Sequence, residues 1–185
     1  MNIDSWNCRG LGNSSKVEVV KDLLRMNSPD VLLLQETKID EDSLLSLRKK
    51  NWKKNAWIAV SAWGSYDGIV ALWTKNIFSL KNSLVMQQRI FSELQHIPSN
   101  ISIVIFNLYV PVNFQDKREC WNSLIDFIAA NSLSNVMVAG DLNIMMGPKE
   151  KKGGICGRHP TLKMVENFIS LWDLIDFKPK NGRYT

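Results

Sequence analysis

Short apolar runs recur along the chain, and several have the length of a β-strand rather than of a helix. The clearest covers residues 136–139 (Val-Met-Val-Ala) and stops at Gly140, and another covers residues 30–35. A continuous apolar run of this length is typical of a strand buried on both faces. The pattern therefore predicts an α/β protein with such strands in its sheet.

Apolar residues at helical spacing separate these runs. Ser14 or Ser15 is predicted to cap the first helix, and Thr161 the last. In the second, acidic residues come first and basic residues last, the order that the helix dipole favours. The predicted helices cover residues 16–26, 40–50, 121–128 and 161–172.

Between residues 56 and 97 the helical spacing gives way to short strand-like segments separated by polar turns, which predicts an antiparallel meander. A long strand follows and ends before Pro111, which cannot continue a ladder. Further strands or hairpin-like elements are predicted at residues 2–6, 101–109, 174–176 and 182–185.

The composition is that of an ordinary globular protein: 185 residues, 45% hydrophobic and 22% charged. No apolar run is long enough to cross a bilayer, and no basic start followed by an apolar segment marks a leader. We therefore expect a single-domain, intracellular protein, nuclear or cytoplasmic, monomeric and without a membrane partner. Trp57, Trp63 and Trp73 are expected to lie mostly in the core.

Net charge and cysteine content bear on the partner and on the redox state of the thiols. The net charge of +5 fits a polyanionic partner without requiring one. The three cysteines are an odd number without framework spacing, which indicates reduced thiols.

Polar side chains follow four of the predicted strands. A carboxylate with amides suits Mg²⁺, which takes one or two carboxylates and leaves positions for phosphate. A tyrosine and an asparagine can hold phosphate oxygens, and an aspartate can orient or deprotonate water. Together they predict metal-assisted phosphodiester hydrolysis. The alternative is a set of unrelated turn, cap, surface and core residues. The residues are Asn7, Glu36, Tyr109, Asp141 and Asn143.

Four motifs, in this order, resemble those of the endonuclease/exonuclease/phosphatase superfamily. They are Ser5-Trp-Asn-Cys-Arg-Gly-Leu-Gly12, Leu34-Gln-Glu-Thr-Lys38, Asn107-Leu-Tyr-Val-Pro111 and Ala139-Gly-Asp-Leu-Asn143. The first motif, together with Glu150-Lys-Lys-Gly-Gly154, is similar to the endonuclease domain of plant LINE-type (non-LTR) retrotransposon polyproteins.

The resemblance implies a fold, a cofactor and partners. The fold is a four-layer α/β sandwich, with two mixed sheets face to face and helices outside. The cofactor is Mg²⁺ or Mn²⁺, and the activity is nicking of DNA. The retroelement likeness also implies a reverse transcriptase domain further along a full-length polyprotein.

The resemblance also suggests a role for each motif residue. Glu36 resembles the principal metal ligand, supported by Asn7, and Tyr109 resembles the tyrosine that contacts phosphate. Asp141 resembles the residue that positions or activates water. Asn143 resembles its neighbour, which contacts phosphate and orients the site.

Basic residues in and near the motifs are candidates for contact with DNA. Lys and Arg neutralise phosphates, and glycines let a backbone approach, so the loop of residues 149–158 is either a DNA contact or a solvated charge run. Thr185 resembles a threonine near the family's DNA-binding edge. The nucleic-acid-binding candidates are Arg9, Lys38, Lys151, Lys152, Arg158 and Thr185.

Two departures from the family pattern matter. Val112 intervenes before Asn113, where retroelement nucleases often have Asn sooner. The family's later Asp and its Ser-Asp-His motif are absent, so we expect a C-terminally truncated domain with little or no activity. His96 and His159 are not expected to replace the missing histidine.

Three functions remain open from the sequence. The first is a metal-dependent DNA endonuclease from a retroelement, the second a phosphatase of the same superfamily acting on a small phosphorylated substrate. The third is a degenerate, non-catalytic fragment with weak nucleic-acid binding.

Overall fold

The computed structural model describes residues 1–64, 67–86, 88–147 and 160–177. The chain divides into two compact units. The first comprises Met1–Tyr109 and Leu133–Leu142, and the second comprises Val110–Ser132 and Asn143–Thr185. Of the elements in the described residues, the first unit holds all the strands and two helices, and the second holds the other two helices.

The first sheet has the strand order β1-β2-β4-β3. Helix α1 (Ser14–Met26) connects β1 to β2, which allows these neighbours to be parallel. The remaining pairs are antiparallel. The strands are β1 (Ile3–Asn7), β2 (Val31–Gln35), β3 (Asn55–Val60) and β4 (Ile69–Thr74).

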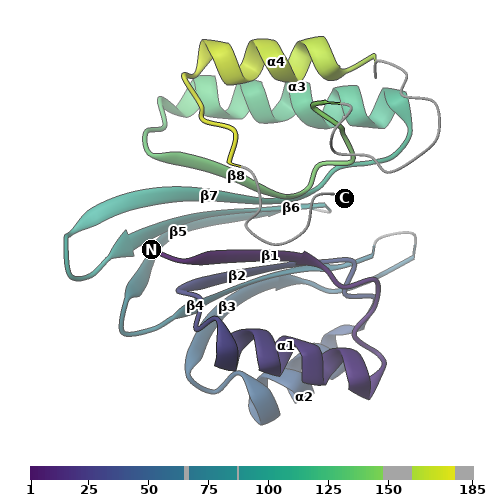
Figure 1. Ribbon diagram of the computed structural model, residues 1–185, viewed down its shortest axis with the longest axis vertical. Helices are drawn as coiled ribbons and strands as arrows, with labels where there is room; N and C mark the ends of the chain where they lie inside the picture. The colour runs from purple at the N-terminus through teal and green to yellow at the C-terminus, as the bar shows by residue number, and fades with distance from the viewer. Residues whose placement is uncertain (65–66, 87, 148–159, 178–185) are drawn as a thin grey trace. The chain divides into compact units, whose positions relative to one another are not determined.

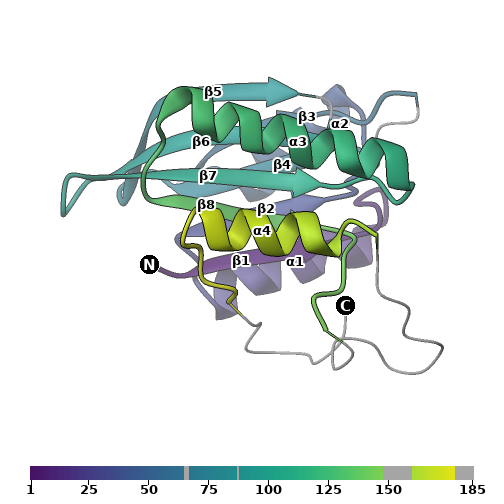
Figure 2. The same cartoon turned by 90° about the horizontal axis from the view of Figure 1, so that it is seen from above.

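The second sheet has the order β5-β6-β7-β8, with β5 to β7 antiparallel and β8 parallel to β7 (Figure 2). The predicted meander is therefore right in its antiparallel pairs but wrong as one sheet, because β4 already has a neighbour on each side and β5 starts a new sheet. The strands are β5 (Phe78–Met86), β6 (Arg89–His96), β7 (Ile101–Tyr109) and β8 (Val136–Asp141).

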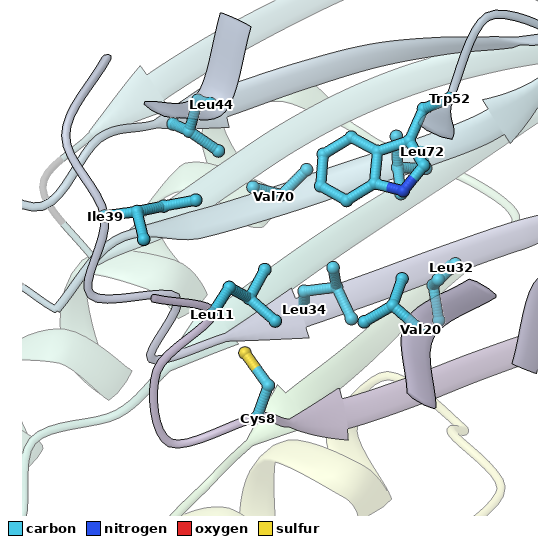
Figure 3. Packing of buried hydrophobic residues seen from close by; sticks show 10 residues of the cluster. All are labelled: Cys8, Leu11, Val20, Leu32, Leu34, Ile39, Leu44, Trp52, Val70 and Leu72. Atoms are coloured by element: carbon cyan, nitrogen blue, oxygen red, sulfur yellow. The ribbon is translucent and has the colours of Figure 1, made fainter. Parts of the chain in front are cut away.

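Strand β2 explains how the layers of the first unit pack. Val31 and Leu33 face the second sheet, where Ile90, Leu94 and other apolar residues meet them. The alternate residues of β2 face α1 and α2 (Glu41–Asn51), as Figure 3 shows for the residues around Leu34. This strand is thus buried on both faces, as predicted.

The fold class predicted from the sequence is confirmed. Two mixed sheets of four strands form an α/β sandwich flanked by helices, and α1 and α2 cover the outer face of the first sheet (Figure 1). None of the helices in the described residues is long and apolar enough to span a bilayer.

Strand β8 differs from its prediction in both length and burial. It continues through Gly140 to Asp141, and all six of its residues are partly exposed because it lies at the edge of the sheet. Gly140 adopts φ +124°, and a Cβ there would stand 2.0 Å from the carbonyl oxygen of Leu108. Only glycine lets β8 approach β7 so closely at this point.

Neither predicted helix cap makes the expected side-chain hydrogen bond. Asn13, rather than Ser14 or Ser15, caps α1, and its side chain accepts a hydrogen bond from the Ser15 N–H at 3.0 Å. Thr161 precedes α4 (Leu162–Leu171) but makes no side-chain capping bond, because its backbone is already helical rather than extended.

The second unit contains α3 (Phe114–Asn131) and α4, with the rings of Trp121 and Phe168 5.8 Å apart. Residues 174–176 form no strand, contrary to prediction, and residues 182–185 lie outside the described residues.

The tryptophans expected in the core are not all there. Trp73 is buried as expected, but Trp63 is 83% exposed.

Candidate active site

Parallel strand pairs bring four motif residues to one end of the first unit. Asn7 ends β1 beside Gln35 of β2, and Tyr109 ends β7 beside Asp141 of β8. Since side chains at the carboxyl ends of neighbouring parallel strands share an edge, this topology collects the candidates of both sheets.

The amide of Asn7 joins the two acidic residues. Its nitrogen donates to Glu36 Oε1 at 2.7 Å and to Asp141 Oδ2 at 2.6 Å. Its oxygen accepts from the backbone N–H of Arg9 at 3.1 Å. Asn7 thereby bonds directly to Asp141, which lies 134 positions away in sequence, and joins it to Glu36.

Glu36 is surrounded by hydrogen-bond donors. Burial would raise the pKa of its carboxyl, but bonds from Asn7, Lys38 and Tyr109 outweigh burial and lower that pKa below its ordinary value. The Lys38 ammonium lies 3.3 Å from Glu36 Oε2. Glu36 is consequently a carboxylate at neutral pH, the form that binds a cation.

Tyr109 has the opposite tendency. Burial raises the pKa of its phenol, and the negative charges of Glu36, Asp67 and Asp141 raise it further. Its hydroxyl hydrogen-bonds to Glu36. The phenol therefore remains protonated and can donate a hydrogen bond to an oxyanion.

Asp67 is a third acidic residue here, which the sequence reasoning missed. Its Oδ1 lies 3.6 Å from the Lys38 ammonium, so Lys38 contacts both Asp67 and Glu36. The available signal was the pair Asp67-Gly68 immediately before the apolar run of β4. Read alone, that pair indicates only a turn.

A buried pair of side-chain amides supports the strand ends, and the sequence did not predict it. Gln35 donates to Asn107 Oδ1 at 2.7 Å, and Asn107 donates to the carbonyl oxygen of Val70 at 2.9 Å. Both side chains are almost fully buried. Gln35 immediately precedes Glu36, and Asn107 lies two residues before Tyr109, so the pair fixes the backbone that carries those two groups. The sequence signal for this pair was a polar residue in or at the end of an apolar run.

The loops at this end are held in unusual backbone conformations. Arg9, Glu36 and Lys38 have φ of 47°, 50° and 52°, a region that costs free energy for residues other than glycine. The Gly10 N–H donates to the Glu36 carbonyl at 2.6 Å, and the Lys38 N–H donates to the Asp67 carbonyl at 2.6 Å. Such over-determined strain is typical of functional loops.

The remaining candidate residues differ in exposure and in the unit to which they belong. Arg9 is exposed. The Lys38 side chain is half exposed. Asn143 belongs to the second unit, where its side chain donates to the Val110 carbonyl at 2.7 Å and its own carbonyl accepts from Lys117. Outside the described residues lie Lys151, Lys152, Arg158 and Thr185.

Within the described residues, no histidine lies at this end of the sheets. His96 ends β6 opposite Ile101, at the other end of β7 from Tyr109, and its ring contacts Phe78 and Ser99. As expected, it does not replace the family's histidine. His159 lies outside the described residues.

The side chains present fit Mg²⁺ or Mn²⁺ better than a metal that needs a closed protein cage. Within the described residues, no three His, Cys, Asp or Glu side chains come close enough to hold a metal ion together. Mg²⁺ needs only one or two carboxylates and keeps its waters, which Glu36 can satisfy. Asn7 turns its nitrogen to the carboxylates, so it positions Glu36 rather than offering a ligand oxygen beside it.

Comparison with known proteins adds a family match. Residues 5–161 match the model of the "Endonuclease/Exonuclease/phosphatase family". No curated protein sequence matches the chain.

Solved structures share the fold at low identity. D. rerio TDP2 complexed with a single-strand DNA product has 16% identity and a TM-score of 0.63, over 78% of this chain and 61% of that one. The human Nocturnin catalytic domain with bound sulfate has 17% identity and a TM-score of 0.58, over 78% and 65%. A mannosyl-6-phosphatase of Bacteroides thetaiotaomicron has 13% identity and a TM-score of 0.62, over 78% and 66%. The chain thus spans less than two thirds of each of these structures.

Proposed function

The chain belongs to the endonuclease/exonuclease/phosphatase family, and from this premise we propose that it hydrolyses phosphodiester bonds of DNA with Mg²⁺ or Mn²⁺. Members of the family are nucleases or phosphatases, so hydrolysis of a phosphate ester is the chemistry to be expected. The observation that carries the proposal is the Asn7 amide, which holds Glu36 and Asp141 together.

The described residues supply most of the groups such a reaction needs. Bound at Glu36, the metal would neutralise phosphate charge and polarise the phosphoryl group. Tyr109, kept protonated, donates to a phosphate oxygen. Asp141 accepts the proton of the attacking water or orients that water. Asn7 keeps the two carboxylates at their separation and in their orientation.

Several observations favour DNA over a small phosphorylated molecule. The chain carries a net charge of +5, and the exposed Arg9 and Lys38 lie just after β1 and β2, close in sequence to Asn7 and Glu36. The first sequence motif and the segment Glu150-Lys-Lys-Gly-Gly154 resemble LINE-type endonucleases. We therefore extend the proposal to a nicking domain of a retroelement polyprotein, which acts beside a reverse transcriptase domain.

A phosphatase is the second candidate, and one observation favours it. The mannosyl-6-phosphatase structure matches the fold about as well as TDP2 does. The groups around Glu36 would serve a monoester equally well. We expect weak hydrolysis in either case, because no histidine within the described residues joins Tyr109 and Glu36.

The test compares two substrates with one protein. Supercoiled plasmid and a sugar phosphate are each incubated with Mg²⁺, and nicks and released phosphate are counted for the wild type and Glu36→Gln. Slow nicking that Glu36→Gln abolishes supports the proposal. Phosphate release without nicking supports the phosphatase. DNA binding with neither reaction supports the non-catalytic alternative.

A further inference from the structure

Trp63 is the most exposed tryptophan in the part of the chain that the structure describes. It is 83% exposed, whereas Trp52, Trp73 and Trp121 are at most 3% exposed. An indole that is 83% exposed gives up most of the hydrophobic gain of burial and leaves its ring available to stack on a ligand.

The backbone places Trp63 at the same edge as the site. Val60, the last residue of β3, pairs with Ile69 of β4, and Ile69 pairs with Gln35 of β2. The strands that end at Asn7, Gln35 and Val60 therefore finish at the same edge of the first sheet, with β4 between the last two. Trp63 lies on the loop that follows the last of them.

Hydrogen bonds tie this loop to the one that carries Glu36. The Ala62 N–H donates to the Ile39 carbonyl at 2.9 Å, and the Thr37 N–H donates to the Gly68 carbonyl at 3.1 Å. Ile39 is three residues after Glu36, a stretch that spans at most about 11 Å. The hydrogen bond of Ala62, the residue before Trp63, thus holds the backbone next to Trp63 at a distance from Glu36 that a few nucleotides of a DNA strand can span.

The chemistry around the ring suits one class of ligand. Arg9 is exposed and the Lys38 side chain is half exposed, so both can neutralise phosphates of a strand that enters the site. Proteins bind unpaired nucleobases by holding the phosphates with charge and stacking a base on an aromatic ring, and this edge of the sheet carries both kinds of side chain.

We infer that Trp63 is a stacking platform for an unpaired base of a DNA strand whose phosphates contact Arg9 and Lys38. The identity of the polyanion rests on the proposed function, but the stacking contact does not depend on hydrolysis. The preferred substrate would then be single-stranded DNA, or duplex DNA with a displaced base near the cleaved bond.

The test removes the base and keeps the phosphates. Binding of a thymidine oligomer of about eight nucleotides is compared with an abasic oligomer of the same length, without added metal so that nothing is cleaved. We expect the wild type to prefer the thymidine oligomer by about tenfold, in line with the stacking contribution of one base. Trp63→Ala should remove that preference, and Trp63→Phe should keep most of it.

Two controls separate stacking from folding and from charge. Met26→Ala removes an exposed apolar side chain at the far end of α1 and should leave the preference unchanged. Lys38→Gln should weaken both oligomers alike and reduce the salt dependence, because it removes a phosphate contact. Trp63→Phe should also abolish the quenching of long-wavelength tryptophan fluorescence by the thymidine oligomer.

Each outcome bears on a defined claim. Equal affinity of the wild type for both oligomers, or an equal loss for both in Trp63→Ala, would overturn the stacking contact. Tighter binding of a uridine ribo-oligomer than of the thymidine oligomer would overturn the assignment to DNA. A Trp63-dependent base preference without any nicking would refute the proposed hydrolysis and leave the stacking contact standing. Nicking without a base preference would support the proposed hydrolysis and overturn the stacking contact.

Discussion

Strands β2 and β8 have the same sequence pattern, an apolar run followed by an acidic residue, and the structure gives them different surroundings. Strand β2 lies inside the first sheet, buried on both faces, whereas β8 lies at the edge of the second and is partly exposed throughout. Glu36, which follows β2, accepts hydrogen bonds from Asn7, Lys38 and Tyr109. An apolar run thus predicts a strand, while the neighbours of that strand determine how deeply it is buried.

Exchange of either carboxylate for its amide should give the largest effect. Glu36→Gln removes the charge that would bind the metal, and we expect the rate of plasmid nicking to fall about 1000-fold, a barrier increase of about 4 kcal/mol. Asp141→Asn should cost a comparable factor if both strand ends serve one reaction. Nicking rates of the two variants check this. A variant that keeps most of the wild-type rate would remove its residue from the site.

Core truncation should distinguish the two strands next. Leu33→Ala in β2 opens a cavity between the sheets and should lower the free energy of unfolding by about 3 kcal/mol. Val138→Ala in β8 removes less apolar volume from a partly exposed position and should cost about 1 kcal/mol. Urea unfolding of both variants measures the difference. Equal losses would show that β8 is as enclosed as β2.

The buried amide pair should contribute less than the core but more than a surface bond. Asn107→Ala removes the 2.7 Å acceptor of the Gln35 amide, which keeps only its bonds with Ser5, and the side-chain donor to the Val70 carbonyl, so it should cost about 2 kcal/mol of stability. Because these groups support Glu36 and Tyr109, the nicking rate should fall as well. The comparison variant Ser92→Ala removes a buried hydroxyl elsewhere in the second sheet and should leave the rate unchanged. An unchanged rate in Asn107→Ala would limit the pair to a stability role.

The smallest expected effect concerns pH. Since the pKa of Glu36 is lower in the folded than in the unfolded chain, its contribution to stability is present above the unfolded pKa and is lost as pH falls through the folded one. Asn7→Ala removes a bond that lowers this pKa, so the pKa should rise and part of the acid-dependent stability should vanish. Carboxyl NMR titration of wild type and variant follows it. A lower pKa in Asn7→Ala would contradict the hydrogen-bond assignment.

Local patterns predicted much of this fold, because hydrophobic periodicity reports which faces are buried. The β2 run, the α2 charge order and the motif residues at strand ends were all visible in the sequence. The switch between sheets after β4 was not visible, because it depends on which strand edges are already paired. Neither was the exposure of Trp63, since an aromatic residue after a strand is usually core.

The site was predictable in its residue types but not in its contacts. The acidic and amide residues stand out because each ends an apolar run. Asp67 did not, because its link to the site is Lys38, 29 positions away in sequence, which only the folded chain brings to 3.6 Å. The donor role of Asn7 was likewise hidden, since the sequence does not show that two carboxylates lie beside its amide.

The central proposal is that the hydrogen-bonded cluster of Asn7, Glu36 and Asp141 binds a divalent cation. Paramagnetic broadening by Mn²⁺ tests it most directly, because broadening reports proximity whether or not the chain is active. We expect Mn²⁺ to broaden the NMR signals of the Asn7 side-chain amide and the Asp141 carboxyl together, and Glu36→Gln to abolish both effects. Broadening near Glu36 that leaves Asp141 sharp would contradict the account.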